Sequence, residues 1–203
     1  LNNMSQERFK SLKEMQNEVS ADKSGTVNPK ELLRLELLTS FEKYTKAMFK
    51  AQYHRSFIVA EHHKKMFAAL QDVVDGNCKR LIINIAPRYG KTELVIKSFI
   101  SWCFALNPKC RFLHLSYSDI LVNDNSDTIR SIMMEQLYTT LFPQSALASE
   151  KGSAKRWKTK AGGELYAVST QGQVTGFGAG NVDIDPELDK MDVGEYIFRF
   201  EDQ

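Results

Sequence analysis

The residues best suited to chemistry are a glycine, a lysine and a threonine in direct succession, Gly90, Lys91 and Thr92. A glycine lets the backbone approach an anion without a Cβ in the way. A lysine supplies positive charge for the β- and γ-phosphates, and a threonine hydroxyl binds Mg²⁺ in phosphate-binding loops. This trio therefore predicts a site for a nucleoside triphosphate. The general loop pattern, G-x-x-x-x-G-K-[ST], has a glycine where this chain has Ile85.

The segments around the trio match the structure that such a loop needs. The apolar run Leu81–Ala86 is typical of a strand, Pro87–Gly90 reads as a turn, and Lys91 opens a segment with apolar residues at helical spacing. A second apolar run, Arg111–Tyr117, follows that helix. Strand, loop, helix and strand predict a βαβ unit with the loop at the carboxyl edge of a parallel sheet. The alternative is an ordinary turn that carries a surface lysine.

The chain before the loop reads as helical. We expect residues 1–55 to form a helical N-terminal extension, with one long helix that begins at Asn28 as its cap. Residues Phe57–Gly76 predict a further helix. Its adjacent histidines, His62 and His63, point in different directions on a helix, so they predict no metal site. Their position one element before the loop is where the adenine of a nucleotide often rests.

Further elements follow the second predicted strand. Ser118 or Asp119 can cap a helix that runs to Phe142, with an interruption near Asn123. Arg130 on this helix is expected to be a solvated residue or, given a nucleotide site, an arginine that stabilises the transition state. After it, two short strands, Trp157–Lys160 and Glu164–Thr170, are predicted to be joined by a turn at Gly162-Gly163.

Composition is that of an ordinary globular protein: 203 residues, 42% hydrophobic and 26% charged, with a net charge of +2. That charge is too small to indicate nucleic-acid binding by itself. The three cysteines, Cys78, Cys103 and Cys110, are an odd number without C-x-x-C spacing, which favours reduced thiols. No apolar run reaches the ~20 residues of a membrane span, so we expect an intracellular protein.

An ordered set of segments from Phe57 to Gly180 resembles the N-terminal ATPase half of tailed-bacteriophage terminase large subunits. It comprises HHKKMFAAL, KRLIINIAPRYGKTE, FLHLSYSDILVNDNSDTIRSIM, LFP, W-x-T and GGELYAVSTQGQVTGFGAG. The loop of that family often lacks the first glycine and carries a Pro-Arg pair, which corresponds here to Pro87-Arg88. The departure at Ile85 therefore fits the family better than the general pattern.

The resemblance implies a function and the residues that perform it. The family's motors hydrolyse ATP with Mg²⁺ and drive double-stranded DNA into procapsids, working as a homo-oligomeric ring with a portal protein and a small terminase subunit. They act in the cytoplasm of the bacterial host, are not virion components and do not involve a membrane. By position, nucleotide would contact Pro87, Arg88, Tyr89, Gly90, Lys91 and Thr92, with Thr92 on Mg²⁺. Catalytic roles would fall on Lys91, Arg88 and Arg130.

The family continues into an acidic strand and a nuclease half for which this sequence offers no match. Asp183 and Asp185 alternate with apolar residues and meet Pro186, which departs from the family's apolar run before paired acids. We therefore expect an incomplete α/β domain of P-loop NTPase type, a parallel sheet flanked by helices, over residues 56–182, and an acidic tail over 183–203 that does not continue the family pattern. Alternatives are another P-loop NTPase of helicase-like type and a nucleotide-binding fragment deficient in hydrolysis.

Overall fold

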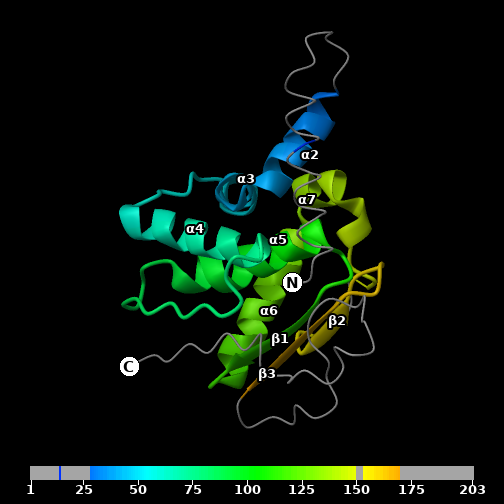
Figure 1. Ribbon diagram of the computed structural model, residues 1–203. Coiled ribbons are helices and arrows are strands. Elements are labelled where there is room, and N and C mark those ends of the chain that lie inside the picture. Colours follow the sequence, from blue (N-terminus) through cyan, green and yellow to red (C-terminus); the bar gives the residue numbers. More distant parts are fainter. Residues whose placement is uncertain (1–13, 15–27, 150–152, 170–203) are drawn as a thin grey trace.

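The computed structural model describes residues 14, 28–149 and 153–169. Over these residues the chain is a mixed α/β protein, with its helices packed together and a small three-stranded sheet at one side (Figure 1). The sequence predictions for residues 1–13 and 15–27, for the glycine-rich loop that ends at Gly180 and for the acidic tail lie outside the described residues.

Helices α2 (Pro29–Thr39) and α3 (Phe41–Tyr53) open the described chain. The predicted cap is confirmed, because the Asn28 side chain accepts a hydrogen bond from the Lys30 N–H at 3.0 Å and proline is the first helical residue. The prediction of one long helix is wrong. Ser40 adopts extended backbone, and its hydroxyl accepts from the Lys43 N–H at 3.3 Å, so it caps a second helix.

Helix α4 (Glu61–Val74) is shorter than predicted, since Phe57–Ala60 is not helical. The start of α4 is fixed by His63, whose Nδ1 accepts a hydrogen bond from the Ala60 N–H at 3.0 Å. This is the task that a glutamate or glutamine performs at the same helical position in a capping box.

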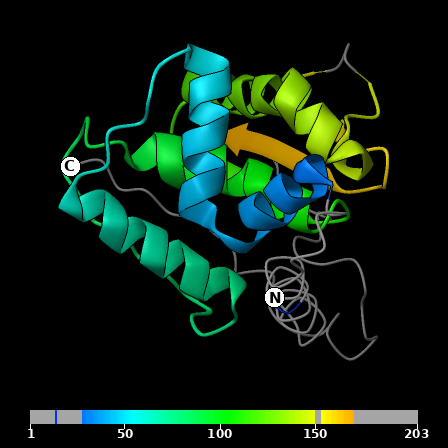
Figure 2. The same cartoon turned by 90° about the horizontal axis from the view of Figure 1, so that it is seen from above.

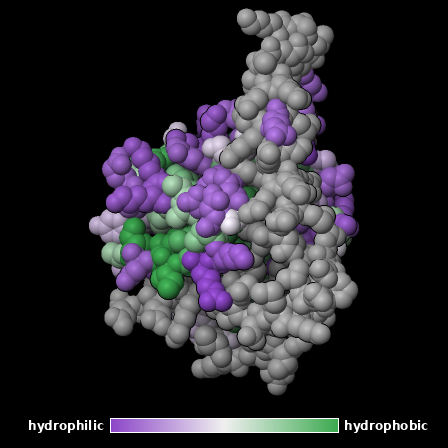
Figure 3. All heavy atoms as spheres, viewed as in Figure 1, coloured by the Kyte–Doolittle hydropathy of each residue, from purple (hydrophilic) through white to green (hydrophobic). Residues whose placement is uncertain are grey.

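The predicted strand at Leu81–Ala86 is not part of the sheet. The segment is extended and its burial alternates, with Leu81, Ile83 and Ile85 packed against the core and Ile82 90% exposed. It runs below α4 in Figure 1, and Figure 3 shows apolar surface in the same area. The predicted βαβ unit is therefore absent from the described residues. The prediction was wrong because an apolar pattern shows which side of a segment is buried, but not which strand the segment pairs with.

A continuous helix follows the loop. It starts at Lys91, has π geometry over η1 (Thr92–Ser98) and becomes α-helical in α5 (Phe99–Leu106). Every residue of α5 is buried, which makes it the centre of the helical layer. Figure 2 shows α3 crossing over this helix, and α2, α3 and α4 share one core cluster with it.

The sheet has the order β1-β3-β2. Strand β1 (Arg111–Ser116) pairs in parallel with β3 (Glu164–Ser169), and β2 (Arg156–Lys158) pairs antiparallel with β3. The predicted hairpin is confirmed, with Gly162 at its turn at φ +95°. The sheet is thus mixed, where a parallel sheet was expected.

Helix α6 (Asp119–Met134) is capped as predicted, since the Ser118 hydroxyl accepts from the Leu121 N–H at 3.4 Å. The expected interruption near Asn123 does not occur. The break lies instead at Glu135, after which come α7 (Gln136–Leu141) and the 3₁₀ turn η2 (Pro143–Ser145).

Three large side chains in the core make polar contacts with neighbouring elements. The Tyr44 hydroxyl donates to Ser101 Oγ at 2.9 Å, and the Tyr138 hydroxyl donates to the Ser101 carbonyl at 3.1 Å. Trp102 Nε1 donates to the Leu37 carbonyl at 2.9 Å. These bonds tie α2, α3 and α7 to the buried central helix, where an unpaired polar group would be costly.

A buried carboxylate links the three strands. Glu164 on β3 is 3% exposed and pairs with Arg111 on β1 at 3.3 Å and with Arg156 on β2 at 2.5 Å. Burial alone would raise the pKa of Glu164, but the hydrogen bond and charge of Arg156, with Lys158 and Arg111, hold it below its ordinary value. The carboxylate therefore stays ionised and holds the strands together at this end of the sheet.

Among the helices that the structure describes, none combines the length and the hydropathy needed to cross a membrane.

Candidate phosphate-binding site

The loop Pro87–Gly90 makes a tight turn between the extended segment and the helix. Two of its residues have left-handed backbone, Arg88 at φ +68° and Gly90 at φ +77°. Alternation of left-handed and ordinary residues turns successive N–H groups toward one side and can form an anion-binding concavity. The Gly90 carbonyl then accepts from the Leu94 N–H at 3.0 Å, so the helix starts directly from the turn.

Lys91 and Thr92 occupy the first positions of this helix. Lys91 is half-buried, whereas Thr92 is exposed. The helix N-terminus adds partial positive charge at this place. The acid that follows, Glu93, is neutralised by Lys97 at 3.1 Å. A lysine, a helix N-terminus and an exposed hydroxyl thus meet at one end of the helix.

The first two turns after the loop have π geometry, over Thr92–Ser98. π-Helical turns are rare and are often found at functional sites. Tyr53 of α3 contacts Glu93 of η1: partial burial of Tyr53, followed by the charge and hydrogen bonding of Glu93, raises the pKa of Tyr53. This contact joins the end of α3 to the start of η1.

His63 on α4 lies directly against the turn. Its Nε2 is 3.2 Å from the Tyr89 carbonyl, while its Nδ1 accepts from the Ala60 N–H. Since Nδ1 is an acceptor here, the proton is on Nε2, which donates to the Tyr89 carbonyl. A Cβ on Gly90 would lie only 2.9 Å from His63 Nε2, so the imidazole occupies the space beside this glycine.

The imidazole of His63 is held neutral. Partial burial, followed by the neighbouring His62, lowers the pKa of His63. The His62 ring lies 3.9 Å from the His63 ring and 5.3 Å, edge to face, from the Tyr89 ring. The two histidines therefore both face the turn, and the expectation that they point in different directions is wrong.

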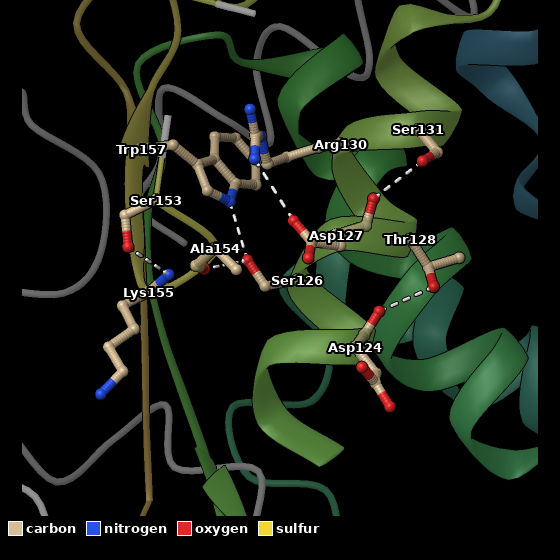
Figure 4. A network of polar contacts seen from close by, with 10 residues as sticks. All are labelled: Asp124, Ser126, Asp127, Thr128, Arg130, Ser131, Ser153, Ala154, Lys155 and Trp157. Atoms are coloured by element: carbon tan, nitrogen blue, oxygen red, sulfur yellow. Dashed lines mark hydrogen bonds and ion pairs between the residues drawn. The ribbon is translucent and has the colours of Figure 1, made fainter. Parts of the chain in front are cut away.

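Arg130 is placed differently. It is 7% exposed on α6, and its Nη1 pairs with Asp127 at 3.3 Å. Figure 4 shows this pair on the side of α6 that faces Trp157 of β2, where Trp157 Nε1 donates to Ser126 Oγ at 2.8 Å. Helix α6 packs against η1, but Arg130 reaches toward the sheet hairpin.

The structure thus brings Pro87, Arg88, Tyr89, Gly90, Lys91 and Thr92 together in one turn and helix start, with Arg130 on a separate helix. Within the described ranges, no group of three or more His, Cys, Asp or Glu side chains could hold a metal ion. Mg²⁺ commonly binds through one or two protein oxygens, substrate phosphates and water. The exposed Thr92 hydroxyl at the helix start fits the protein part of that role.

Comparison with protein-family models, with curated proteins and with solved structures gives no match for this chain.

Proposed function

We propose that this chain binds the triphosphate of ATP, with Mg²⁺, through Pro87–Thr92, and that it is the ATP-binding part of a phage DNA-packaging motor of the terminase large-subunit type. In such a motor, ATP hydrolysis drives double-stranded DNA into procapsids. The observation that carries the proposal is the turn itself: left-handed backbone at Arg88 and Gly90, followed immediately by a helix that begins at Lys91. The motif order from Phe57 to Gly180 supports the packaging role and the P-loop NTPase class.

The backbone of the loop and three of its side chains have distinct parts in this proposal. Backbone N–H groups of the turn and of the helix start would bind phosphate oxygens. The Lys91 ammonium would pair with the β- and γ-phosphates, and Thr92 would provide an oxygen to Mg²⁺, which neutralises phosphate charge. Arg88 would reach the γ-phosphoryl group from the turn.

Replacing Lys91 by methionine tests the proposal directly. Methionine keeps an unbranched side chain but removes the charge. Hydrogen bonds to charged groups contribute about 1.5–3 kcal/mol, so we expect ATP affinity to fall about 10- to 100-fold. Isothermal titration calorimetry with ATP and Mg²⁺ measures the change.

The matched control is Lys109→Met, which removes one positive charge from an exposed lysine beyond the other end of the same helix. Its ATP affinity should equal that of the unsubstituted protein. Absence of ATP binding in the unsubstituted protein, or equal affinities in both lysine variants, would overturn the proposal.

For Arg88, the left-handed backbone decides which substitution is informative. Alanine is strained at φ +68°, whereas asparagine tolerates this region. An arginine that meets charge developing on the γ-phosphoryl group acts mainly in the transition state. If the protein hydrolyses ATP, we therefore expect Arg88→Asn to lower kcat by about 10³-fold, the lower end of the effect of such an arginine, with little change in KM. Steady-state kinetics decides it, and equal losses of binding and turnover would make Arg88 a ground-state phosphate ligand instead.

A further inference from the structure

The contact between α4 and the loop suggests a residue that shapes the phosphate site from outside it. His63 Nε2 donates to the Tyr89 carbonyl, and the same ring fills the space beside Gly90. The donor and the acceptor are 26 residues apart in the sequence. The turn is therefore supported from a helix that is not adjacent to it in the chain.

The hydrogen bond from His63 orients a peptide group inside the turn. The Tyr89 carbonyl belongs to the peptide group that joins Tyr89 to Gly90, so its orientation also sets the direction of the Gly90 N–H. Holding the carbonyl toward His63 turns this N–H away from the histidine, because the two groups of a trans peptide point in opposite directions. A backbone N–H fixed in this way is the kind of donor that a phosphate-binding turn requires.

The histidine is itself held in the required state. Nδ1 accepts from the Ala60 N–H, which fixes the tautomer that carries a proton on Nε2. Phe57 packs on its ring in an edge-to-face arrangement, with ring centroids 5.1 Å apart, and His62 lies on it at 3.9 Å. Orientation and protonation of the donor are thus both set before any ligand arrives.

We propose that His63 is a positioning residue of the phosphate site: through Nε2–H it fixes the Tyr89–Gly90 peptide in the orientation that binds the triphosphate. The inference rests on the proposed function, since it names the group that prepares the same site. His63 does not touch the nucleotide phosphates in this scheme and acts only through the backbone of the turn.

Two substitutions separate the two hydrogen bonds of the imidazole. In His63→Asn the side-chain oxygen can stand where Nδ1 is, so the bond from Ala60 persists, but nothing reaches the Tyr89 carbonyl. In His63→Gln the longer amide can place a nitrogen near the position of Nε2 and restore the donor to the turn. Both variants keep an uncharged amide side chain in the first turn of α4, and thermal melts check that both are folded.

The experiment measures ATP affinity with Mg²⁺ by calorimetry and, without nucleotide, amide hydrogen exchange in the peptide that covers residues 87–93. We expect His63→Asn to bind ATP about tenfold more weakly, in line with the loss of one supporting hydrogen bond, and to exchange faster in this peptide. His63→Gln should match the unsubstituted protein in both measurements.

The outcomes are distinguishable. Equal affinity of the asparagine variant and the unsubstituted protein would overturn the positioning role and leave the proposed function standing. Equal weakening in both variants, with unchanged exchange at the turn, would also overturn it, because the Nε2 donor would then be irrelevant. If the unsubstituted protein does not bind ATP, the proposed function fails, and the positioning role fails with it.

Discussion

Replacing Trp102 by alanine is expected to lower the free energy of unfolding by about 3–5 kcal/mol, the usual cost of removing a large buried aromatic side chain. Trp102 is fully buried in α5 and stacks near Phe41, with ring centroids 5.1 Å apart. The substitution also leaves the Leu37 carbonyl without the indole donor. Since a domain is usually stable by only 5–15 kcal/mol, this loss is a large share of the total.

Urea denaturation followed by circular dichroism measures this effect. The control is Tyr117→Ala, which removes an aromatic side chain that is 65% exposed and should change stability by less than about 1 kcal/mol. A loss below that value for Trp102→Ala would mean that α5 is not the centre of the core.

The second large effect concerns pH and His114. This histidine of β1 is 3% exposed, and burial lowers its pKa from 6.5 to about 4. The folded state therefore binds a proton less readily than the unfolded chain. The contribution of His114 to the free energy of unfolding is complete above pH 6.5 and decreases as the pH falls toward the pKa of the folded state. At pH 5 the free energy of unfolding is reduced by about 2 kcal/mol.

Urea midpoints at pH 7.5 and pH 5, with stability derived by linear extrapolation, test this expectation. In His114→Asn most of the difference between the two pH values should disappear, whereas His54→Asn, at an exposed left-handed position that asparagine tolerates, should retain it. His63, whose pKa is also lowered, contributes in the same direction in both variants. An unchanged difference in His114→Asn would show that the imidazole is not buried as a neutral group.

Local signals in the sequence predicted much of the fold. Asn28 before Pro29 and Ser118 before α6 are caps that act within three residues, and the hairpin turn at Gly162 depends on a residue that tolerates positive φ. Such features need no information from distant parts of the chain. The helix start at Lys91 belongs to the same group.

The predictions that were wrong or left open concern features that depend on contacts between residues distant in the sequence. Leu81–Ala86 has the composition of a strand, but pairing depends on a neighbour that no local pattern identifies. The contact of His63 with Tyr89 is likewise non-local, and an adjacent pair of histidines does not show which of them faces the loop. For Arg130, helical spacing could not distinguish a solvated arginine from one buried beside Asp127.

The π geometry of Thr92–Ser98 has a mechanical consequence for Lys91. An α-helix advances about 100° around its axis with each residue, at 3.6 residues per turn, and a wider π-helix advances less. Across this segment the chain is therefore underwound relative to α5, and the direction in which Lys91 leaves the helix depends on that winding. If the segment returned to α geometry, Lys91 would rotate about the helix axis while the buried helix α5 stayed in place. The winding of the π-helical segment therefore sets the direction in which the Lys91 side chain points.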